Sequence, residues 1–236
     1  MFIHFHSHRR AVCPPFAEDA MSIEIESQIE NPDRVEWRRE QVVNAAVERF
    51  AQNGYHATTI KEIAETAGVS PGLIYTYVKD KEDVLLLVFL AAFRRYQTEI
   101  PQKIAGISDP LQKFRAAFRA YCECVGSNLD STLIAYQESK SLKPGRRKIV
   151  QDLEIKTNAL ISEPLQDCIK AGYIACANVD LATFHLILHA HGWALKNWFF
   201  RERISLNGYI EEGLSRFLNS SLTPSGWERW RAEAKG

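Results

Sequence analysis

The stretch TTIKEIAETAGVSPGLIYTYVKDKEDVL, residues 58–85, contains two short helical patterns separated by a single glycine. Apolar side chains recur at helical spacing through Ile60, Ile63 and Ala67, and Gly68 ends this first pattern. A Ser-Pro pair then restarts the chain as a second helix that carries few charges. Two helices joined by so short a turn predict a helix-turn-helix unit.

Capping residues specify the turn between these two helices. Thr59 and Glu62 occupy the two positions of a capping box, in which each side chain bonds the backbone of the other residue. Ser70 is the expected N-cap of the second helix. Pro71 falls at the first position of that helix, where its missing N–H costs nothing. The sequence therefore fixes where both helices begin.

The second helix has the composition expected of one that enters the major groove of DNA. Pro71 and Gly72 keep its first turn thin, so that its backbone can approach a duplex. Ile74 and Val78 are predicted to face inward, and Lys81 follows in the next helix. A helical hairpin in a packed bundle would explain the caps and the apolar spacing equally well. It would not explain two tyrosines and a Pro-Gly pair on the outer side of a short helix. The residues left facing outward or sideways on that helix are Leu73, Tyr75, Thr76 and Tyr77.

Residues 35 to about 95 resemble the DNA-binding domain of the TetR family of bacterial transcriptional regulators. The resemblance rests on the unbroken run AAVERFAQNGYHATTIKEIAETAGVSPGLIYTYVKDKEDVL. This sequence departs from the family at Leu73, Tyr77 and Val78, where Thr, His and Phe are more usual. The resemblance implies that Thr59, Ser70, Tyr75, Tyr77 and Lys81 contact the DNA backbone, and that Pro71, Gly72, Leu73 and Thr76 line the base edges.

The composition is that of an ordinary globular protein. Of 236 residues, 46% are apolar and 25% are charged, and 29 basic residues balance 29 acidic ones. Because no net charge attracts nucleic acid, any DNA binding must come from a local site and from two copies on a palindromic operator. Five cysteines without a disulfide framework indicate reduced thiols and a cytoplasmic protein. The sequence also predicts no metal site, no cofactor and no membrane span, since it contains no apolar run of about 18 residues.

The predicted fold class is all-α, with a three-helix DNA-binding domain followed by a helical ligand-binding and dimerisation domain. We expect a flexible leader at 1–32, the DNA-binding domain at 33–95, the effector and dimer domain at 96–222, and a C-terminal tail at 223–236. The helix that begins at Lys81 is expected to end before Pro101. Further helices are expected at about 109–126, 130–141, 145–172, 179–201 and 206–220, the third of them kinked or divided by Pro164.

The C-terminal half carries polar side chains inside apolar helices, where they need partners. An effector is one such partner, and the candidate effector-binding residues are Tyr121, Tyr136, Glu138, His189, Trp193 and Asn197. The run from 181 to 200 is apolar nearly all round, which indicates a helix buried on several sides. By resemblance this helix and the next form a four-helix dimer bundle with a second copy. An intramolecular core is the alternative.

The predicted function is a homodimeric, ligand-responsive repressor. The C-terminal segment is similar to family members that respond to acyl-CoA thioesters, and Arg146, Arg147 and Lys148 are candidates to contact a nucleotide phosphate. The sequence shows no P-loop, GxSxG or HExxH motif, so no enzyme class is indicated. The remaining alternative is a helical dimer that binds a small molecule without specific DNA binding.

Overall fold

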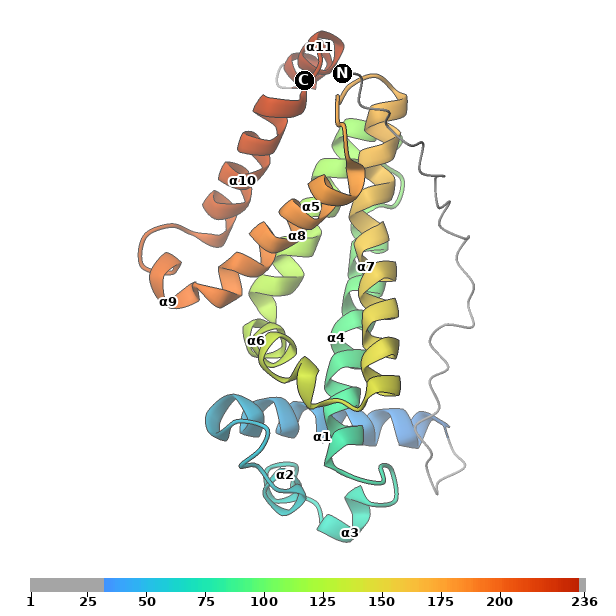
Figure 1. Cartoon of the computed structure of the whole chain (residues 1–236), viewed down its shortest axis with the longest axis vertical. Coiled ribbons are helices and arrows are strands. Elements are labelled where there is room, and N and C mark those ends of the chain that lie inside the picture. Colours follow the sequence, from blue (N-terminus) through green and yellow to red (C-terminus); the bar gives the residue numbers. More distant parts are fainter. Residues whose placement is uncertain (1–31, 234–236) are drawn as a thin grey trace, which may run out of the picture.

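The computed structural model describes residues 32–233, and most of these residues lie in helices (Figure 1). Within this part of the chain the only β pairing is an isolated bridge between Ile174 and Leu222, so the predicted all-α class is confirmed. The predicted leader lies outside the described residues, except for residue 32, which begins the first helix. The helices are α1 (Pro32–Asn53), α2 (Ile60–Thr66), α3 (Pro71–Ile74), α4 (Lys81–Ile104), α5 (Pro110–Ser127), α6 (Leu129–Glu138), α7 (Pro144–Lys170), α8 (Val179–Leu195), α9 (Asn197–Phe200), α10 (Leu206–Ser221) and α11 (Pro224–Glu233), with a 3-10 turn at Ser139–Ser141.

Helices α1, α2 and α3 form a small unit at one end of the molecule (Figure 1). The apolar face of α1 is buried through Val42, Ala46 and Phe50, against Ile63 of α2 and Ile74 of α3. Helices α1 and α2 are each followed by a glycine with positive φ. Gly54 has a φ of 78° after α1, and Gly68 has a φ of 66° after α2. Such angles suit glycine because it has no Cβ to clash.

Helix α4 belongs to both halves of the molecule. Its N-terminal part, from Val84 to Phe89, is buried in the core of the three-helix unit. Its C-terminal part, through Tyr96 and Ile100, is buried in a second core that α5, α7, α8 and α10 complete. The first core also takes in Ile134 of α6 and Val150 of α7, so it extends across the expected domain boundary at residue 95. The two halves are therefore joined by shared packing and not by a linker.

Two prolines do not end the helices that contain them. Helix α4 continues through Pro101 to Ile104, and α7 runs undivided through Pro164 to Lys170. Pro164 is buried beside Ile161 and Leu165 in the second core, so tertiary packing stabilises the helix on both sides of it. A proline removes one hydrogen bond from a helix, and the packing of a long helix offsets that loss. The expected division of α7 was therefore wrong.

The C-terminal segment 223–236 was expected to be a tail, but residues 224–233 form α11. Thr223, the residue before this helix, accepts through Oγ1 from the Gly226 N–H at 3.1 Å and donates to the Gly172 carbonyl at 2.6 Å. Arg229 then pairs with Asp109 at 2.6 Å, and the Arg115 guanidinium lies 4.1 Å from the centre of the Trp230 ring. These contacts attach α11 to the end of the molecule opposite the helix-turn-helix unit (Figure 1). The sequence did not predict this helix because the residues that it contacts lie over 50 positions away in the chain.

Candidate functional site

The short helix α3 is held by the caps that the sequence predicts. Ser70 accepts through Oγ from the Leu73 N–H at 3.2 Å. In the preceding helix Thr59 Oγ1 accepts from the Glu62 N–H at 3.2 Å, and the Glu62 carboxylate accepts from the Thr59 N–H at 2.7 Å. The predicted capping box and N-cap are thus confirmed. They set the angle between α2 and α3 and leave the start of α3 at the surface.

The outer side of α3 is an exposed edge made of Ser70, Pro71, Gly72 and Tyr75. Half of Tyr75 is exposed, and a Cβ placed on Gly72 would meet no atom within 4 Å. Leu73 and Thr76 are partly exposed beside it, and Thr59 is exposed at the start of α2. Ile74 and Val78 are buried, as the helical spacing predicts. This edge, which we call the α3 edge, is thin and open to solvent.

Two residues predicted to reach DNA are used inside the protein. Tyr77 is only 3% exposed, so it does not face outward as expected, and its carbonyl accepts from Arg39 at 3.1 Å. The expectation was wrong because α3 ends at Ile74, and the turn that follows rotates Tyr77 toward the interior. Lys81 donates through Nζ to the carbonyls of Tyr55, His56 and Thr58 at 2.8–3.0 Å. It ties the loop between α1 and α2 to α4 and does not point away from the protein.

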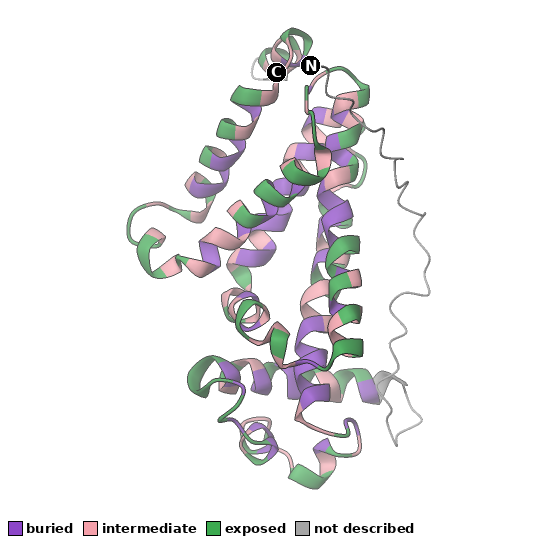
Figure 2. Ribbon diagram, viewed as in Figure 1, coloured by how far each residue is buried: buried purple, intermediate pink, exposed green. Residues whose placement is uncertain are grey.

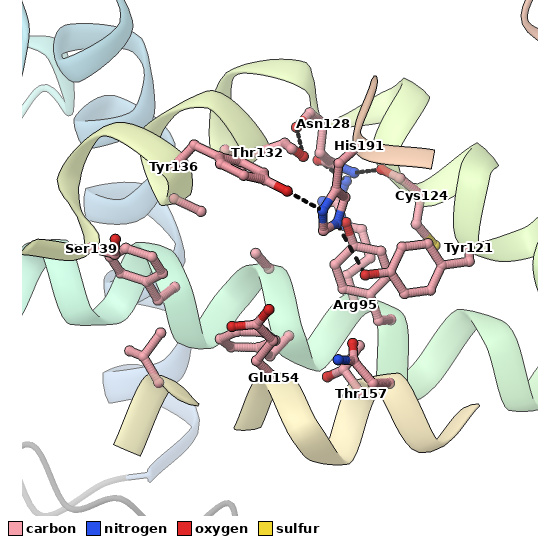
Figure 3. A pocket seen from close by; sticks show the side chains of 18 residues that line it. Arg95, Tyr121, Cys124, Asn128, Thr132, Tyr136, Ser139, Glu154, Thr157 and His191 are labelled. Carbon is pink, nitrogen blue, oxygen red and sulfur yellow. Dashed lines mark hydrogen bonds between the residues drawn. The ribbon is translucent and has the colours of Figure 1, made fainter. Parts of the chain in front are cut away.

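A cavity of about 220 Å³ lies between α4, α5, α6, α7 and α8 in the C-terminal half (Figure 3). Its α4 side is mostly apolar and presents Phe89, Ala92, Phe93 and Tyr96. The cavity adjoins both hydrophobic cores, because Phe89 belongs to the first and Tyr96 to the second. A molecule bound here would contact the helix that the two halves of the protein share.

One wall of the cavity is a hydrogen-bonded row of three rings. His191 of α8 lies between Tyr121 and Tyr136, with Nε2 3.1 Å from the Tyr121 hydroxyl and Nδ1 3.0 Å from the Tyr136 hydroxyl (Figure 3). Burial lowers the pKa of His191 to about 4, so the ring is neutral at pH 7. A neutral imidazole has one donor and one acceptor, and each tyrosine satisfies one of them.

The opposite wall comes from one face of α7, where Glu154, Thr157 and Asn158 border the cavity. Figure 3 shows Glu154 and Thr157 across the cavity from Tyr136 and His191. Burial raises the pKa of the Glu154 carboxyl above its usual value. Sequence reasoning missed these three residues, although their spacing of three and four within a partly apolar helix was a usable signal.

Of the six predicted effector-binding residues, Tyr121 and Tyr136 border the cavity and the other four do not. Glu138 accepts from Ser141 Oγ at 2.8 Å and lies 3.7 Å from His56 of the loop between α1 and α2. His189 stacks on Tyr209 with ring centres 4.3 Å apart, and Trp193 packs against the same tyrosine. Asn197 begins α9, away from the cavity. His191, two residues after His189, is the histidine that borders the cavity.

An ion-pair cluster joins the start of α7 to the residues that follow α3. Arg146 contacts Asp80 at 3.5 Å and Glu82 at 3.3 Å, and it also hydrogen-bonds Asp83. Lys143 pairs with Glu82 at 3.0 Å. We call these five residues the interdomain cluster. Asp83 is 2% exposed and also accepts from the Lys79 N–H at 2.7 Å, so the cluster holds the turn after α3.

Hydrogen bonds and ion pairs keep two carboxyls of the interdomain cluster charged. Burial alone would raise the pKa of Asp80, but the Asp83 N–H and Arg146 outweigh it and lower that pKa. Burial alone would also raise the pKa of Glu82, but hydrogen bonds from Lys143 and the charge of Arg146 outweigh it and lower that pKa. The predicted phosphate-binding run 146–148 is therefore already engaged. Arg146 serves this cluster, Arg147 donates to the Lys140 and Leu142 carbonyls, and Lys148 pairs with Asp152.

Within residues 32–233, no group of three or more His, Cys, Asp or Glu side chains is placed to hold a metal ion. In the same part of the chain, no helix combines the length and the apolar character that crossing a membrane requires. Cys122, Cys124 and Cys168 are buried and Cys176 is partly exposed, and all four are free thiols.

Comparison with known proteins gives matches along most of the chain. Residues 42–88 match the model described as "Bacterial regulatory proteins, tetR family", and residues 108–201 match "Tetracyclin repressor-like, C-terminal domain". The HTH-type transcriptional regulator HbdR of Aromatoleum sp. (strain CIB) is 39% identical over 202 residues, covering 86% of this chain and 88% of that protein.

Solved structures share the fold. A tetR-family regulatory protein from Rhodococcus RHA1 has a TM-score of 0.68 at 24% identity, covering 77% of this chain and 96% of its own. AibR, solved in complex with isovaleryl coenzyme A and operator DNA, has a TM-score of 0.67 at 17% identity, covering 77% of this chain and 98% of its own. The match therefore includes both halves of the molecule.

Proposed function

Because the chain belongs to the tetR family of bacterial regulatory proteins, and is a transcriptional regulator and not an enzyme, we propose that it is a homodimeric repressor. Two copies bind a palindromic operator in the cytoplasm through their α3 edges. An acyl-CoA thioester, through its acyl group, or another small molecule with an apolar group enters the cavity and weakens that binding. The observation that carries the proposal is the α3 edge itself, an exposed and glycine-thinned helix start held by two sets of caps.

The proposed DNA contacts follow from exposure. The exposed part of the predicted set consists of Thr59, Ser70, Pro71, Gly72 and Tyr75, with Leu73 and Thr76 partly exposed beside them. A hydroxyl such as that of Tyr75 can donate to a phosphate, and a thin helix start can approach base edges in the major groove. Tyr77 and Lys81 act indirectly in this proposal, since they position the turn and the loop that hold α3.

An exposed apolar stripe on α8 supports the proposed dimer. Leu181, Phe184 and Leu188 recur at spacings of three and four and are 44–54% exposed. Figure 2 shows buried and exposed positions alternating along α8 and α10, so each helix also packs inward. A stripe of large apolar side chains on a helix face is the usual mark of a protein interface. A second copy related by a twofold axis would cover both stripes together.

Leu188→Glu is expected to dissociate the dimer. The substitution places a carboxylate at the C-terminal end of the stripe on both copies, where each loses an apolar contact and must bury a charge. We expect the dimer dissociation constant to rise about 100-fold or more. Analytical ultracentrifugation across a concentration series measures it. Ile155→Glu is the matched control, because Ile155 is 56% exposed on α7, away from the stripe. Equal effects of the two variants, or none, would contradict the proposed interface.

The size of the cavity limits which part of the effector it can hold. Sites for drug-sized ligands measure roughly 300–1,000 Å³, so a cavity of about 220 Å³ accepts an acyl or aryl group and not a nucleotide. A second hollow of about 490 Å³ lies outside it and shares Ala92, Arg95, Asn128 and Ser131 with its lining. The remainder of a thioester would leave through this shared border. The isovaleryl coenzyme A bound by AibR is an example of such a ligand in this fold.

The interdomain cluster offers a route from the cavity to α3. Glu154, Thr157 and Asn158 of α7 border the cavity, and Arg146 and Lys143 lie at the start of the same helix. A ligand that shifts α7 therefore changes the hold on the turn after α3. The ligand must prefer one arrangement over the other, and coupling of about 1–3 kcal/mol would change DNA affinity roughly 5–150-fold.

Selection from a random duplex library, followed by fluorescence anisotropy on the enriched sequence, tests this function. We expect a palindromic site whose affinity falls steeply as salt rises, because phosphate contacts release counterions. Tyr75→Ala should weaken binding about tenfold without changing the melting temperature, since half of its side chain is exposed. Failure to enrich any sequence would instead favour a small-molecule-binding dimer. Normal binding by Tyr75→Ala would show that α3 does not enter the groove as proposed.

A further inference from the structure

The α7 wall of the cavity contains buried polar atoms that the protein itself leaves without partners. Asn158 is 6% exposed, and neither its amide nitrogen nor its amide oxygen has a hydrogen-bond partner among the described residues. Thr157 is 1% exposed, and its hydroxyl is likewise unpartnered within residues 32–233. Both residues border the cavity. Buried polar groups in folded proteins are nearly always hydrogen-bonded, so these exceptions need an explanation.

Several other polar residues of the lining have hydrogen-bond partners within the protein. Tyr121, Tyr136 and His191 bond one another, as described above. Asn128, the second asparagine of the lining, donates to the Cys124 carbonyl at 3.0 Å and accepts from Arg95. The unpartnered atoms are therefore concentrated on one face of α7, with Glu154 one turn earlier on the same face. If the cavity were only a packing defect, we would expect unpartnered polar atoms to be scattered over its walls and not gathered on α7.

The chemistry of these groups restricts what can satisfy them. An asparagine side chain offers two donors and an acceptor, and a threonine hydroxyl offers one donor and accepts. A saturated hydrocarbon chain would remove both from water and bond neither, which is unfavourable. An anionic group would lie beside the Glu154 carboxyl, while Arg95, the one basic side chain of the lining, is already engaged. A cation such as an ammonium has no acceptor for the Asn158 N–H groups, so the complementary group is neutral and both donates and accepts.

We propose that Asn158 and Thr157 form a polar subsite that reads a neutral, donor-and-acceptor group, such as a carboxamide or a hydroxyl, at the buried end of the effector. The rest of that buried end is apolar and lies over Phe93 and Tyr96 on the α4 side. The inference rests on the proposed effector cavity and narrows it, because it excludes a plain saturated acyl chain as the preferred ligand. A cavity of about 150 Å³ can hold benzene, so 220 Å³ accommodates one ring with a small substituent.

Three probes of nearly the same shape test the subsite. Benzamide both donates and accepts, acetophenone only accepts, and isopropenylbenzene does neither. We expect the full-length protein to bind benzamide about tenfold more tightly than isopropenylbenzene, with acetophenone between them. Isothermal titration calorimetry, or saturation-transfer NMR for millimolar affinities, measures the three dissociation constants.

Two substitutions on α7 and one matched control locate the effect. Asn158→Leu has a similar shape and no polar atoms, so the preference for benzamide should disappear or reverse. Thr157→Val is an isosteric change in the same subsite, and it should reduce the preference several-fold even if Asn158→Leu does not fold. Thr183→Val is the control. Thr183 is also buried, and its hydroxyl has no partner among the described residues, but it lies outside the cavity lining. The Thr183→Val variant should therefore prefer benzamide as strongly as the wild-type protein does.

The outcomes separate this inference from the proposed function. If the wild-type protein binds all three probes equally, or both α7 variants keep the preference for benzamide, the polar subsite is wrong while the cavity remains a binding site. If the wild-type protein binds none of the three probes at millimolar concentration, the subsite is wrong and the cavity also fails as the effector site. Operator binding, measured without any probe, is unaffected by either result.

Discussion

Gly72→Glu is expected to abolish operator binding, with a loss in affinity of about 100-fold or more, while the protein keeps its fold. Gly72 is exposed, its φ is not in the left-handed region, and an added Cβ meets no atom within 4 Å. The substitution therefore costs little in the free protein. In the complex with DNA, the introduced glutamate side chain would add bulk and a negative charge where the start of α3 must approach the phosphates. Like charges placed together in an interface cost on the order of several kcal/mol. Fluorescence anisotropy with the selected operator measures the loss.

The chain contains its own control for this change. Helix α7 also begins with Pro-Gly, and a Cβ on Gly145 likewise meets nothing within 4 Å. Gly145→Glu introduces the same charge at the same helical position in a part of the molecule that is not proposed to touch DNA. It should bind the operator as the wild-type protein does. If the two variants are equally impaired, the α3 edge does not explain the loss. Added net charge, or a disturbed interdomain cluster beside Gly145, then explains it.

Arg146→Met is expected to lower the free energy of unfolding by about 3 kcal/mol. Arg146 is the residue that contacts all three carboxyls of the interdomain cluster, and the Asp83 carboxyl is almost fully buried. Removing the guanidinium leaves that carboxyl without its ion pair, although the charge of Arg39 still acts on it. A buried charge that loses its paired partner is more costly than the loss of a surface pair. Urea denaturation followed by circular dichroism measures the change.

A double variant and a neighbouring control test the cause. Asp83→Asn keeps an acceptor for the Lys79 N–H but removes the charge, so Arg146→Met with Asp83→Asn should recover most of the lost stability. Lys148→Met removes an exposed pair with Asp152 and should change stability by less than about 0.5 kcal/mol. If the double variant is as unstable as the sum of the single variants, the ion pair does not account for the effect.

The interdomain cluster predicts how the free energy of unfolding changes with pH. The folded-state pKa values of Asp80 and Glu82 lie below their ordinary values. Their contribution to stability is therefore present above the ordinary carboxyl range, about pH 4, and is lost as the pH falls through the lower folded-state values. Protonating these carboxyls would remove the pairing with Arg146 and Lys143 and loosen the turn after α3.

The helix-turn-helix unit was predictable because its determinants are local. Thr59, Glu62 and Ser70 act on backbone groups no more than three residues away, and Gly68 adopts the positive φ that ends a helix. Tyr77 shows where such local reasoning stops. It was assigned to the outer face by assuming that α3 continues, but α3 ends at Ile74 and Tyr77 is buried.

By itself the sequence determined the all-α class, the caps and the exposed edge of α3, because the spacing of apolar residues and backbone capping operate within one or two helical turns. Only the tertiary structure decided which polar residues face the cavity, and why Arg146 and Lys81 serve the protein's own groups. Four of the polar residues that line the cavity lie on four different helices and are up to 70 residues apart in the sequence. They are Tyr121, Tyr136, Asn158 and His191. Their convergence depends on how those helices pack, which the periodicity of any one helix does not specify.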